Sequence, residues 1–271
     1  MNHTKILFLD LDDTLLNSKK EITQKNAAAI EAALQEGHRI VINSGRPLMA
    51  ITAQIDALNL NKKGCYAIAY NGGVIYDSYT RQVIYQKSLS IPDVQYIFAE
   101  AEKYGLYCQT YSSTHLLTNQ EAPELHAYIS RFHLPYLIDS HCPGNLTEEP
   151  VKALVIGDES REKSLAYRAH MEEWSKGRIS IFFSNQLYLE HVATGVSKGA
   201  AIQWLCSHLN IPMEYTIAAG DAENDIPMLK TAQVGAAVAN AAESVKAVAD
   251  YITECDCNHD AVAEIIKKFI L

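Results

Sequence analysis

Short apolar runs alternate with helical patterns at the beginning of the chain. Continuous apolar stretches, typical of strands that are buried on both faces, occur at residues 5–9, 39–43 and 66–70. Apolar residues at helical spacing between these runs predict helices over residues 21–37 and 47–58. This order of strands and helices predicts a parallel sheet with helices on both of its faces.

The alternation stops after residue 72 and resumes near residue 197. Residues 73–76 and 82–86, separated by a polar turn, predict a hairpin. From residue 92 to about residue 189, helices and strands mix without regular alternation. Helix and strand patterns then alternate again, with predicted elements at residues 197–209, 215–219, 226–231, 234–238, 242–249 and 261–269.

One α/β core that carries an insertion accounts for both changes of pattern. A chain of 271 residues has room for roughly two domains. We therefore predict a doubly wound, Rossmann-like parallel sheet that is interrupted by an inserted α+β domain. The predicted boundaries are residues 1–85 and 191–271 for the core and residues 86–190 for the insertion.

The composition is that of an ordinary globular protein. Apolar residues make up 48% of the chain and charged residues 20%, which excludes disorder and collagen-like repetition. The apolar run at residues 6–9 is followed at once by Asp10, Asp12 and Asp13, and no stretch reaches about 18 uninterrupted apolar residues. The sequence therefore predicts neither a spanning helix nor a secretory signal, and hence no membrane partner.

The charge balance argues against nucleic acid as a partner. Lys and Arg number 23 and Asp and Glu number 32, a net charge of −9 with neutral histidine, and no run of basic residues forms a patch. The long-range field of such a chain repels anionic ligands. Binding a small anion therefore requires metal ions, individual lysines or helix N-termini close to it.

The six cysteines are scattered along the chain. Without an export signal, this distribution predicts reduced thiols and a cytoplasmic protein. Cys255, Cys257 and His259 form a C-x-C-x-H triplet, but a recognised zinc spacing needs a second pair of ligands. We favour a loop before the last helix over a metal site for these three residues.

Two polar groups follow the first two predicted strands. Asp10 and Asp12 come directly after the first apolar run, and their spacing can direct both carboxylates to one side. Ligands of open α/β sheets bind beyond the carboxyl ends of the strands, where these acids lie. Ser44, Gly45 and Arg46 end the second strand, and a hydroxyl at a helix start is suited to an oxyanion. Taken singly, an acidic turn and an ordinary helix start explain both groups as well.

Two further polar groups lie after the insertion. Lys198 opens a predicted helix, although an isolated lysine is usually solvated. The sequence GDAEND at residues 220–225 places three acids and an amide after another strand, and hard oxygen ligands of this kind suit Mg²⁺. A capped loop would have the same composition. The order of the four groups favours a site, because all of them fall at strand ends or helix starts on the predicted ligand side.

Together these motifs resemble those of the haloacid dehalogenase-like hydrolases, specifically the Cof-type phosphatases that carry a class IIB cap. The matching residues are Asp10-x-Asp12-x-Thr14, Ser44-Gly45-Arg46, Asn71-Gly72-Gly73, Gly195-Val196-Ser197-Lys198-Gly199, Gly220-Asp221-x-x-Asn224-Asp225, Val238-Ala239-Asn240-Ala241, Lys246 and Ala249-Asp250. The match covers the core, whereas the insertion matches by position and length. Asp13 and Ser44 stand where many members have glycine and threonine.

The resemblance implies a phosphatase that works through an aspartyl-phosphate. Asp10 would be the nucleophile and Asp12 the general acid and base. Mg²⁺ would bind to the carboxylates of Asp10 and Asp221 and to the backbone carbonyl of Asp12, and Asp225 would bind the ion directly or through one of its ligands. The phosphate would be held by Lys198 and by further donors, namely Ser44, Asn224 and the backbone N–H groups of Leu11 and Gly45.

The resemblance also implies that the inserted domain is a cap, which excludes water and contacts the leaving group. Such a cap suits small phosphorylated metabolites, with sugar phosphates among them. Candidate contacts are Arg46, Asn71, Gly72, Glu190 and His191, although the last two could equally form a hinge. A phosphomutase with the same intermediate and a catalytically silent, metabolite-binding regulator are the alternatives. We expect a monomer or a small homo-oligomer.

Overall fold

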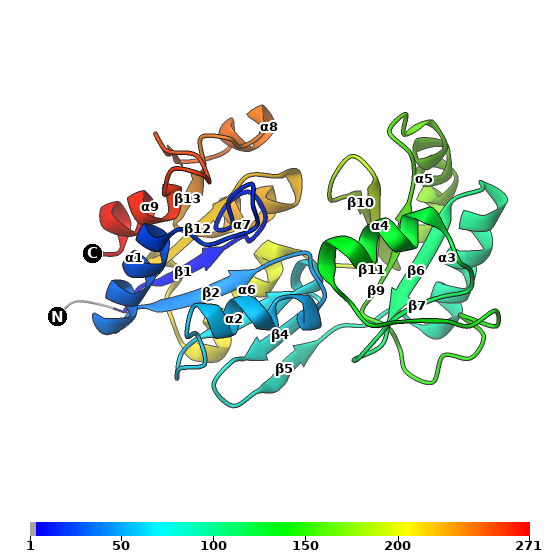
Figure 1. Ribbon diagram of the computed structural model, residues 1–271, viewed down its shortest axis with the longest axis horizontal. Helices are drawn as coiled ribbons and strands as arrows, with labels where there is room; N and C mark the ends of the chain where they lie inside the picture. The colour runs from blue at the N-terminus through cyan, green and yellow to red at the C-terminus, as the bar shows by residue number, and fades with distance from the viewer. Residues whose placement is uncertain (1–3) are drawn as a thin grey trace. The chain divides into compact units, whose positions relative to one another are not determined.

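The computed structural model describes residues 4–271, and the chain forms two compact units. The core unit comprises the chain up to Tyr85 together with Ser197–Leu271, and the cap unit comprises Gln86–Val196 (Figure 1). The chain thus returns to the core at Ser197, later than the predicted position at residue 191. The reason is that the strand over Tyr188–Ala193 pairs with two other strands of the cap sheet.

An eight-stranded sheet forms the centre of the core unit, in the order β14-β13-β12-β1-β2-β3-β4-β5. Its strands are β1 (Ile6–Leu9), β2 (Arg39–Asn43), β3 (Tyr66–Ala69), β4 (Val74–Asp77), β5 (Gln82–Gln86), β12 (Thr216–Gly220), β13 (Val234–Ala237) and β14 (Tyr251–Ile252). The strands from β14 to β3 run parallel, and β4 runs antiparallel to β3. The predicted Rossmann-like sheet is confirmed, and β1 lies in it between β12 and β2.

Helices flank the core sheet, namely α1 (Gln24–Gln35), α2 (Thr52–Ala57), α6 (Lys198–Leu209), α7 (Ile226–Thr231), α8 (Glu243–Lys246) and α9 (Ala261–Phe269). α6 and α7 pack through Ile202 and Leu229 against the face that carries Ile6 and Phe8, and α1 packs along α9. All four residues of β1 are buried, which explains its continuous apolar run. Over residues 4–271, no helix has the length and apolar character needed to cross a membrane.

Two core helices differ from their predicted extents, and one core strand was not predicted. The helix predicted over residues 47–58 is divided into a 3₁₀ turn, η1 (Leu48–Ala50), and α2. The helix predicted over residues 242–249 is the four-residue α8. The two-residue strand β14 was not predicted, because two residues are too few to show an alternation, and its pairing with β13 defines it.

The cap unit is a second sheet with its own helices. Its strand order is β10-β11-β9-β6-β7-β8, with helices on both faces of the sheet. α3 and α5 pack through Ile97 and Met171 with Cys108 of β6, whereas Tyr128 of α4 contacts Tyr111, which alternation places on the opposite face. The elements are α3 (Ile91–Lys103), β6 (Tyr107–Tyr111), β7 (Leu116–Thr118), α4 (Pro123–Phe132), β8 (Tyr136–Ile138), β9 (Lys152–Ile156), α5 (Glu162–Ser175), β10 (Ile179–Phe183) and β11 (Tyr188–Ala193).

Candidate active site

The carboxyl ends of neighbouring strands bring acidic residues together. β1 and β12 pair in parallel with Leu9 opposite Ala219, so Asp10 and Asp221 follow two adjacent strand ends. The backbone N–H of Asp10 donates to the Ala219 carbonyl at 3.0 Å, which continues this pairing. Asp10 is buried and Asp221 is partly buried. The predicted ligand side of the sheet therefore carries the predicted acids.

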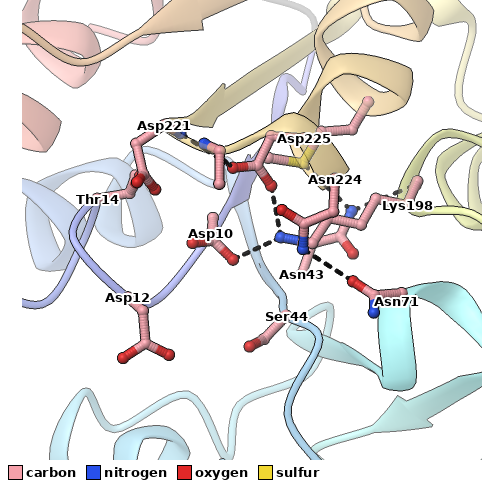
Figure 2. Close-up of polar contacts among 12 residues, drawn as sticks. Asp10, Asp12, Thr14, Asn43, Ser44, Asn71, Lys198, Asp221, Asn224 and Asp225 are labelled. Atoms are coloured by element: carbon pink, nitrogen blue, oxygen red, sulfur yellow. Dashed lines mark hydrogen bonds and ion pairs between the residues drawn. The ribbon is translucent and has the colours of Figure 1, made fainter. Parts of the chain in front are cut away.

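A buried lysine joins two acids of this site. α6 begins at Lys198 because the Ser197 hydroxyl accepts a hydrogen bond from the backbone N–H of Ala200 at 3.1 Å. Lys198 is only 1% exposed. Its Nζ lies 2.5 Å from Asp10 Oδ1 and 2.5 Å from Asp225 Oδ1 (Figure 2). A cation is thus held between two buried carboxylates.

Asp225 is fixed through both of its oxygens. Oδ2 accepts hydrogen bonds from the backbone N–H groups of Asp221 at 2.9 Å and Ala222 at 3.0 Å, while Oδ1 faces Lys198. Gly220 makes this close approach possible, since an added Cβ would lie 2.5 Å from the Asp225 side chain. Asp225 therefore holds both Lys198 and the turn that follows β12.

The acidic cluster carries more negative charge than its lysine balances. Oxygens of Asp10, Asp221 and Asp225 lie within 4.8 Å of one another. Burial raises the pKa of Asp10 to about 7 against the opposing charge of Lys198. Burial and the charge of Asp10 together raise the pKa of Asp221 to about 8. Burial disfavours the Lys198 ammonium, but Asp10 and Asp225 outweigh it and raise the pKa of Lys198. Hard carboxylate oxygens in this arrangement fit a divalent cation such as Mg²⁺.

Asp12 lies apart from the acidic cluster (Figure 2). Its carboxylate accepts hydrogen bonds from Arg46 Nε and Nη2, both at 2.7 Å, and Lys20 Nζ lies 3.1 Å from Asp12 Oδ1. Burial opposes ionisation of Asp12, but Arg46 and Lys20 outweigh it and lower the pKa of Asp12 to about 2. Arg46, predicted as a substrate contact, thus holds the carboxylate of the predicted acid and base.

Ser44, Asn71 and Asn224 come from three loops and contribute further polar groups to the site (Figure 2). Ser44 is buried, and its hydroxyl accepts a hydrogen bond from the backbone N–H of Arg46 at 3.2 Å. Asn224 Nδ2 donates to Asn71 Oδ1 at 2.9 Å, whereas Asn71 Nδ2 is buried with no hydrogen-bond partner within residues 4–271. A Cβ added to Gly45 would lie 2.9 Å from Asn71 Oδ1, so glycine allows this approach. The site therefore contains a buried donor that is not in use.

A left-handed turn presents Asn71 to the site. Tyr70, Asn71 and Gly72 have φ angles of 53°, 57° and 105°. A side chain at Gly72 would overlap the backbone carbonyl of Ser197, at the beginning of α6. Only glycine satisfies both the backbone conformation and the lack of space at this position. The role of Gly72 visible in the structure is to let this turn pack against α6.

The remaining residues predicted to contact phosphate or substrate are Leu11, Glu190 and His191. Leu11 is buried, and its carbonyl accepts a hydrogen bond from the backbone N–H of Leu16 at 2.8 Å. Within the cap unit, Glu190 is 3% exposed and pairs with Lys152 Nζ at 2.8 Å. His191 is also buried, and its Nε2 lies 3.0 Å from the hydroxyl of Tyr167. Both cap residues are therefore engaged by neighbours inside the cap.

Comparison with known proteins decides the family. The model of the haloacid dehalogenase-like hydrolases matches residues 7–266. The chain belongs to this family. A solved haloacid dehalogenase-like hydrolase from Bacteroides thetaiotaomicron has a TM-score of 0.89 at 30% identity, and the match covers 98% of this chain and 99% of that chain. The predicted fold of this haloacid dehalogenase-like hydrolase is thereby confirmed.

Two further relatives are phosphatases by name. The 5-amino-6-(5-phospho-D-ribitylamino)uracil phosphatase YcsE of Bacillus subtilis is 29% identical, over 98% of this chain and 96% of its own length. A solved subclass IIB sugar phosphatase of the superfamily has a TM-score of 0.83 at 26% identity, and the match covers 98% of this chain and 99% of that chain. This haloacid dehalogenase-like hydrolase is therefore an enzyme, a phosphatase of the Cof type with a class IIB cap.

Two residues of this haloacid dehalogenase-like phosphatase contribute to the site although they were not predicted as site residues. The Thr14 hydroxyl donates to Asp221 Oδ1 at 2.9 Å. Asn43 is buried, and its Nδ2 donates to the Lys198 carbonyl at 3.3 Å. Their positions in the sequence were the available signal, because Thr14 belongs to the first motif and Asn43 is a polar residue that ends a buried strand.

Lowering the pH is expected to destabilise this phosphatase through His191. Burial, the main cause, lowers the pKa of His191 to about 3, although backbone hydrogen bonds to Leu189 and Ala153 oppose it. A histidine in the unfolded chain has a pKa of about 6.5. Between these two pKa values the unfolded state binds a proton that the folded state does not. The free energy of unfolding therefore decreases as the pH falls from about 6.5 towards 3, by about 2 kcal/mol at pH 5.

Urea unfolding of wild type and His191→Gln at pH 7.5 and pH 5 measures this effect. The glutamine variant is expected to lose about 2 kcal/mol less than wild type on acidification. His126→Gln is the control, because His126 is an exposed histidine of the same cap unit. Identical pH dependence in wild type and His191→Gln would contradict the prediction.

Proposed function

We propose that this enzyme is a Mg²⁺-dependent phosphatase that hydrolyses phosphate monoesters of small metabolites through an aspartyl-phosphate. The observation that supports it most is the buried group of Lys198, Asp10, Asp221 and Asp225 at the carboxyl end of the sheet. This group combines a carboxylate nucleophile, a fixed cation for phosphate and oxygen ligands for a metal ion.

Asp10 is the nucleophile in this proposal. One of its oxygens attacks phosphorus, the bond between phosphorus and the leaving-group oxygen breaks, and the phosphoryl group remains on Asp10. Water then attacks the same phosphorus, the bond to Asp10 breaks, and inorganic phosphate leaves. Lys198, at 2.5 Å from Asp10 Oδ1, favours the ionised nucleophile and neutralises charge that develops on the phosphate oxygens.

Asp12 is the general acid and base. It gives a proton to the leaving alkoxide in the first step and takes one from the attacking water in the second. With its pKa lowered to about 2 by Arg46 and Lys20 against burial, the carboxylate is ionised and binds a proton only weakly while these contacts are in place. To donate a proton, Asp12 must be released from the bidentate contact with Arg46. We therefore assign to Arg46 control over the protonation of Asp12.

Asp10 and Asp221 would hold Mg²⁺, together with the backbone carbonyl of Asp12. When bound, the ion polarises a phosphate oxygen and offsets the repulsion between phosphate and carboxylates. Asp225 differs from the other two acids, because Lys198 and two backbone N–H groups already engage its oxygens. We therefore assign Asp225 to positioning Lys198.

The names of two relatives and an unused donor in the site support a substrate class. YcsE is named for a phosphorylated ribityl compound, and the solved subclass IIB relative is named a sugar phosphatase. Asn71 Nδ2, buried and unused beside Ser44, is suited to an oxygen of the phosphate or of a hydroxylated leaving group. We propose sugar phosphates or similar small phosphorylated metabolites as substrates.

Phosphate release from a substrate panel tests this function. The panel contains sugar phosphates, nucleotides, phosphoglycolate, pyridoxal phosphate and p-nitrophenyl phosphate, each assayed with Mg²⁺ and with EDTA. We expect release from at least one sugar phosphate, with a loss of about 100-fold or more in EDTA that added Mg²⁺ restores.

Three results would contradict the proposal in different ways. Release that EDTA does not affect would exclude the metal requirement. An isomerised phosphate ester without inorganic phosphate, detected by ³¹P NMR, would identify a phosphomutase. No reaction with any compound of the panel would contradict the proposed substrate class.

A further inference from the structure

A turn after β13 forms hydrogen bonds with both loops that carry acidic residues, the loop after β1 and the loop after β12. The backbone N–H of Ala242 donates to the Asp221 carbonyl at 3.0 Å, and Asn240 Nδ2 donates to the Asp13 carbonyl at 2.7 Å. We propose that Asn240 is a positioning residue for Asp12 and acts through the backbone of Asp13. The proposal rests on the proposed function, in which Asp12 is the general acid and base.

The backbone conformation of Asp13 explains why a support is needed. Its φ angle is 58°, in the left-handed region that residues with a side chain adopt less readily than glycine. This conformation turns the chain directly after Asp12. The bond from Asn240 holds the Asp13 carbonyl, and Lys20 Nζ lies 3.1 Å from Asp12 Oδ1 and 3.2 Å from Asp13 Oδ1. Asn240 therefore holds the backbone of this turn, whereas Lys20 contacts its two carboxylates.

Asn240 is itself fixed by the segment before α9. Its Oδ1 accepts a hydrogen bond from the backbone N–H of Cys257 at 2.9 Å, so both polar atoms of the side chain are engaged. The backbone N–H of Ala239 donates to Thr253 Oγ1 at 3.0 Å and to the Cys255 carbonyl at 3.2 Å. The segment with Cys255 and Cys257 thus supplies backbone contacts that orient Asn240.

The same segment provides a matched comparison. Asn258 Oδ1 accepts hydrogen bonds from Ser18, from the backbone N–H at 3.1 Å and from Oγ at 2.8 Å. Ser18 belongs to the loop that follows Asp12, but it lies six residues after Asp12 in the sequence. Asn240 and Asn258 therefore bind one loop with the same type of side chain, but only Asn240 holds the residue next to Asp12.

Because Asp12 acts as an acid in the first step and as a base in the second, a displaced Asp12 carboxylate should affect two kinds of substrate differently. With an alkyl phosphate, the leaving alkoxide needs a proton, so a displaced Asp12 slows both steps. With p-nitrophenyl phosphate, p-nitrophenolate leaves without a proton, so only the attack of water on the phosphorylated enzyme is slowed. A residue that merely stabilises the fold would reduce the active fraction for both substrates equally.

The test compares Asn240→Asp, Asn240→Ala and Asn258→Ala with wild type in the full-length enzyme with Mg²⁺. Asp12→Asn is the reference for complete loss of the acid and base. Steady-state kcat and KM are measured with the best alkyl phosphate of the panel, and the pre-steady-state burst with p-nitrophenyl phosphate. Asn240→Asp keeps an acceptor for the Cys257 N–H but removes the donor to the Asp13 carbonyl.

We expect both Asn240 variants to lose about 10-fold in kcat for the alkyl phosphate, part of the range of general acid–base catalysis, with little change in KM. Their first p-nitrophenolate burst should keep the wild-type rate and be followed by a slower steady state, as in Asp12→Asn. Asn258→Ala should behave as wild type. This pattern would support the proposal.

Several results would overturn the positioning role. One is a loss of the p-nitrophenolate burst rate or amplitude equal to the loss of kcat with the alkyl phosphate, and another is wild-type kinetics in both Asn240 variants. A defect in Asn240→Ala but not in Asn240→Asp would assign the effect to the Cys257 contact. Failure of the proposed function is seen separately, because wild type itself would then release no phosphate.

Discussion

Replacing Asp10 by asparagine is expected to lower the rate of phosphate release by about 10⁴-fold or more. The amide has the shape of the carboxylate but does not form the phosphoryl-enzyme bond. Stability should not fall. Because burial, opposed by Lys198, raises the pKa of Asp10 to about 7, the charged carboxylate is costly in the folded protein, and asparagine removes this cost. Lys198 keeps its partner Asp225 at 2.5 Å.

Steady-state phosphate release and thermal unfolding of Asp10→Asn measure these two effects. Acid quenching with a labelled substrate adds a third measurement, since wild type should yield a phosphorylated enzyme and the variant none. Asp56→Asn is the control, because it makes the same change at an exposed position of the core unit. Release near the wild-type rate by folded Asp10→Asn would exclude Asp10 as the nucleophile.

Replacing Lys198 by methionine is expected to impair both turnover and stability. Loss of a positioned charge that stabilises the transition state lowers kcat by about 10²–10³-fold. In addition, Asp10 and Asp225 would remain buried and close together without the cation between them. Removing one partner of a buried ion pair costs about 3–5 kcal/mol. Methionine fills a similar volume, so a cavity is not the main cause of this cost.

The pH dependence of Lys198→Met distinguishes charge repulsion from a packing defect. Burial raises the pKa of Asp10 to about 7 against the opposing charge of Lys198, so without the lysine this pKa lies further above the value of about 3.9 for an unfolded aspartate. The folded state then binds more protons than the unfolded state, so the stability of the variant falls as the pH rises through the raised pKa of Asp10. Acidification from pH 8 to pH 6, or added Mg²⁺, should therefore restore part of the stability.

Urea unfolding at both pH values, with and without Mg²⁺, measures the stability of this variant. Lys230→Met is the control, because Lys230 is an exposed lysine of α7 in the same unit. The control should be as stable and as active as wild type. A loss of stability in Lys198→Met that neither protons nor Mg²⁺ reduce would contradict the electrostatic explanation.

The core and its acidic cluster could be predicted because their causes are local in the sequence. β1 and β2 are buried almost throughout, so each appears as an apolar run. Parallel strands of one sheet end at the same edge, and for this reason Asp10 and Asp221 could be expected together. Lys198 could be recognised only with the other motifs, since a lysine that opens a helix is by itself a common surface residue.

Contacts between distant polar side chains could not be predicted. The pair of Asp12 and Arg46 joins two loops, and both residues also fit other roles when their motifs are considered singly. The pairing of Glu190 with Lys152 depends on the register of β9 and β11, which no local pattern specifies. Periodicity reports which face of an element is apolar, but not which polar groups meet.

The position of the cap in the chain sets an order of events during protein synthesis. β1 is made early, whereas its neighbour β12 and the residue Lys198 follow only after Gln86–Val196 has been made. Domains generally fold as units while the chain emerges. The cap can therefore fold on a ribosome-bound chain whose core sheet is still incomplete. A chain that ends before Ser197 contains a whole cap and the proposed nucleophile Asp10, but lacks Lys198, Asp221 and Asp225.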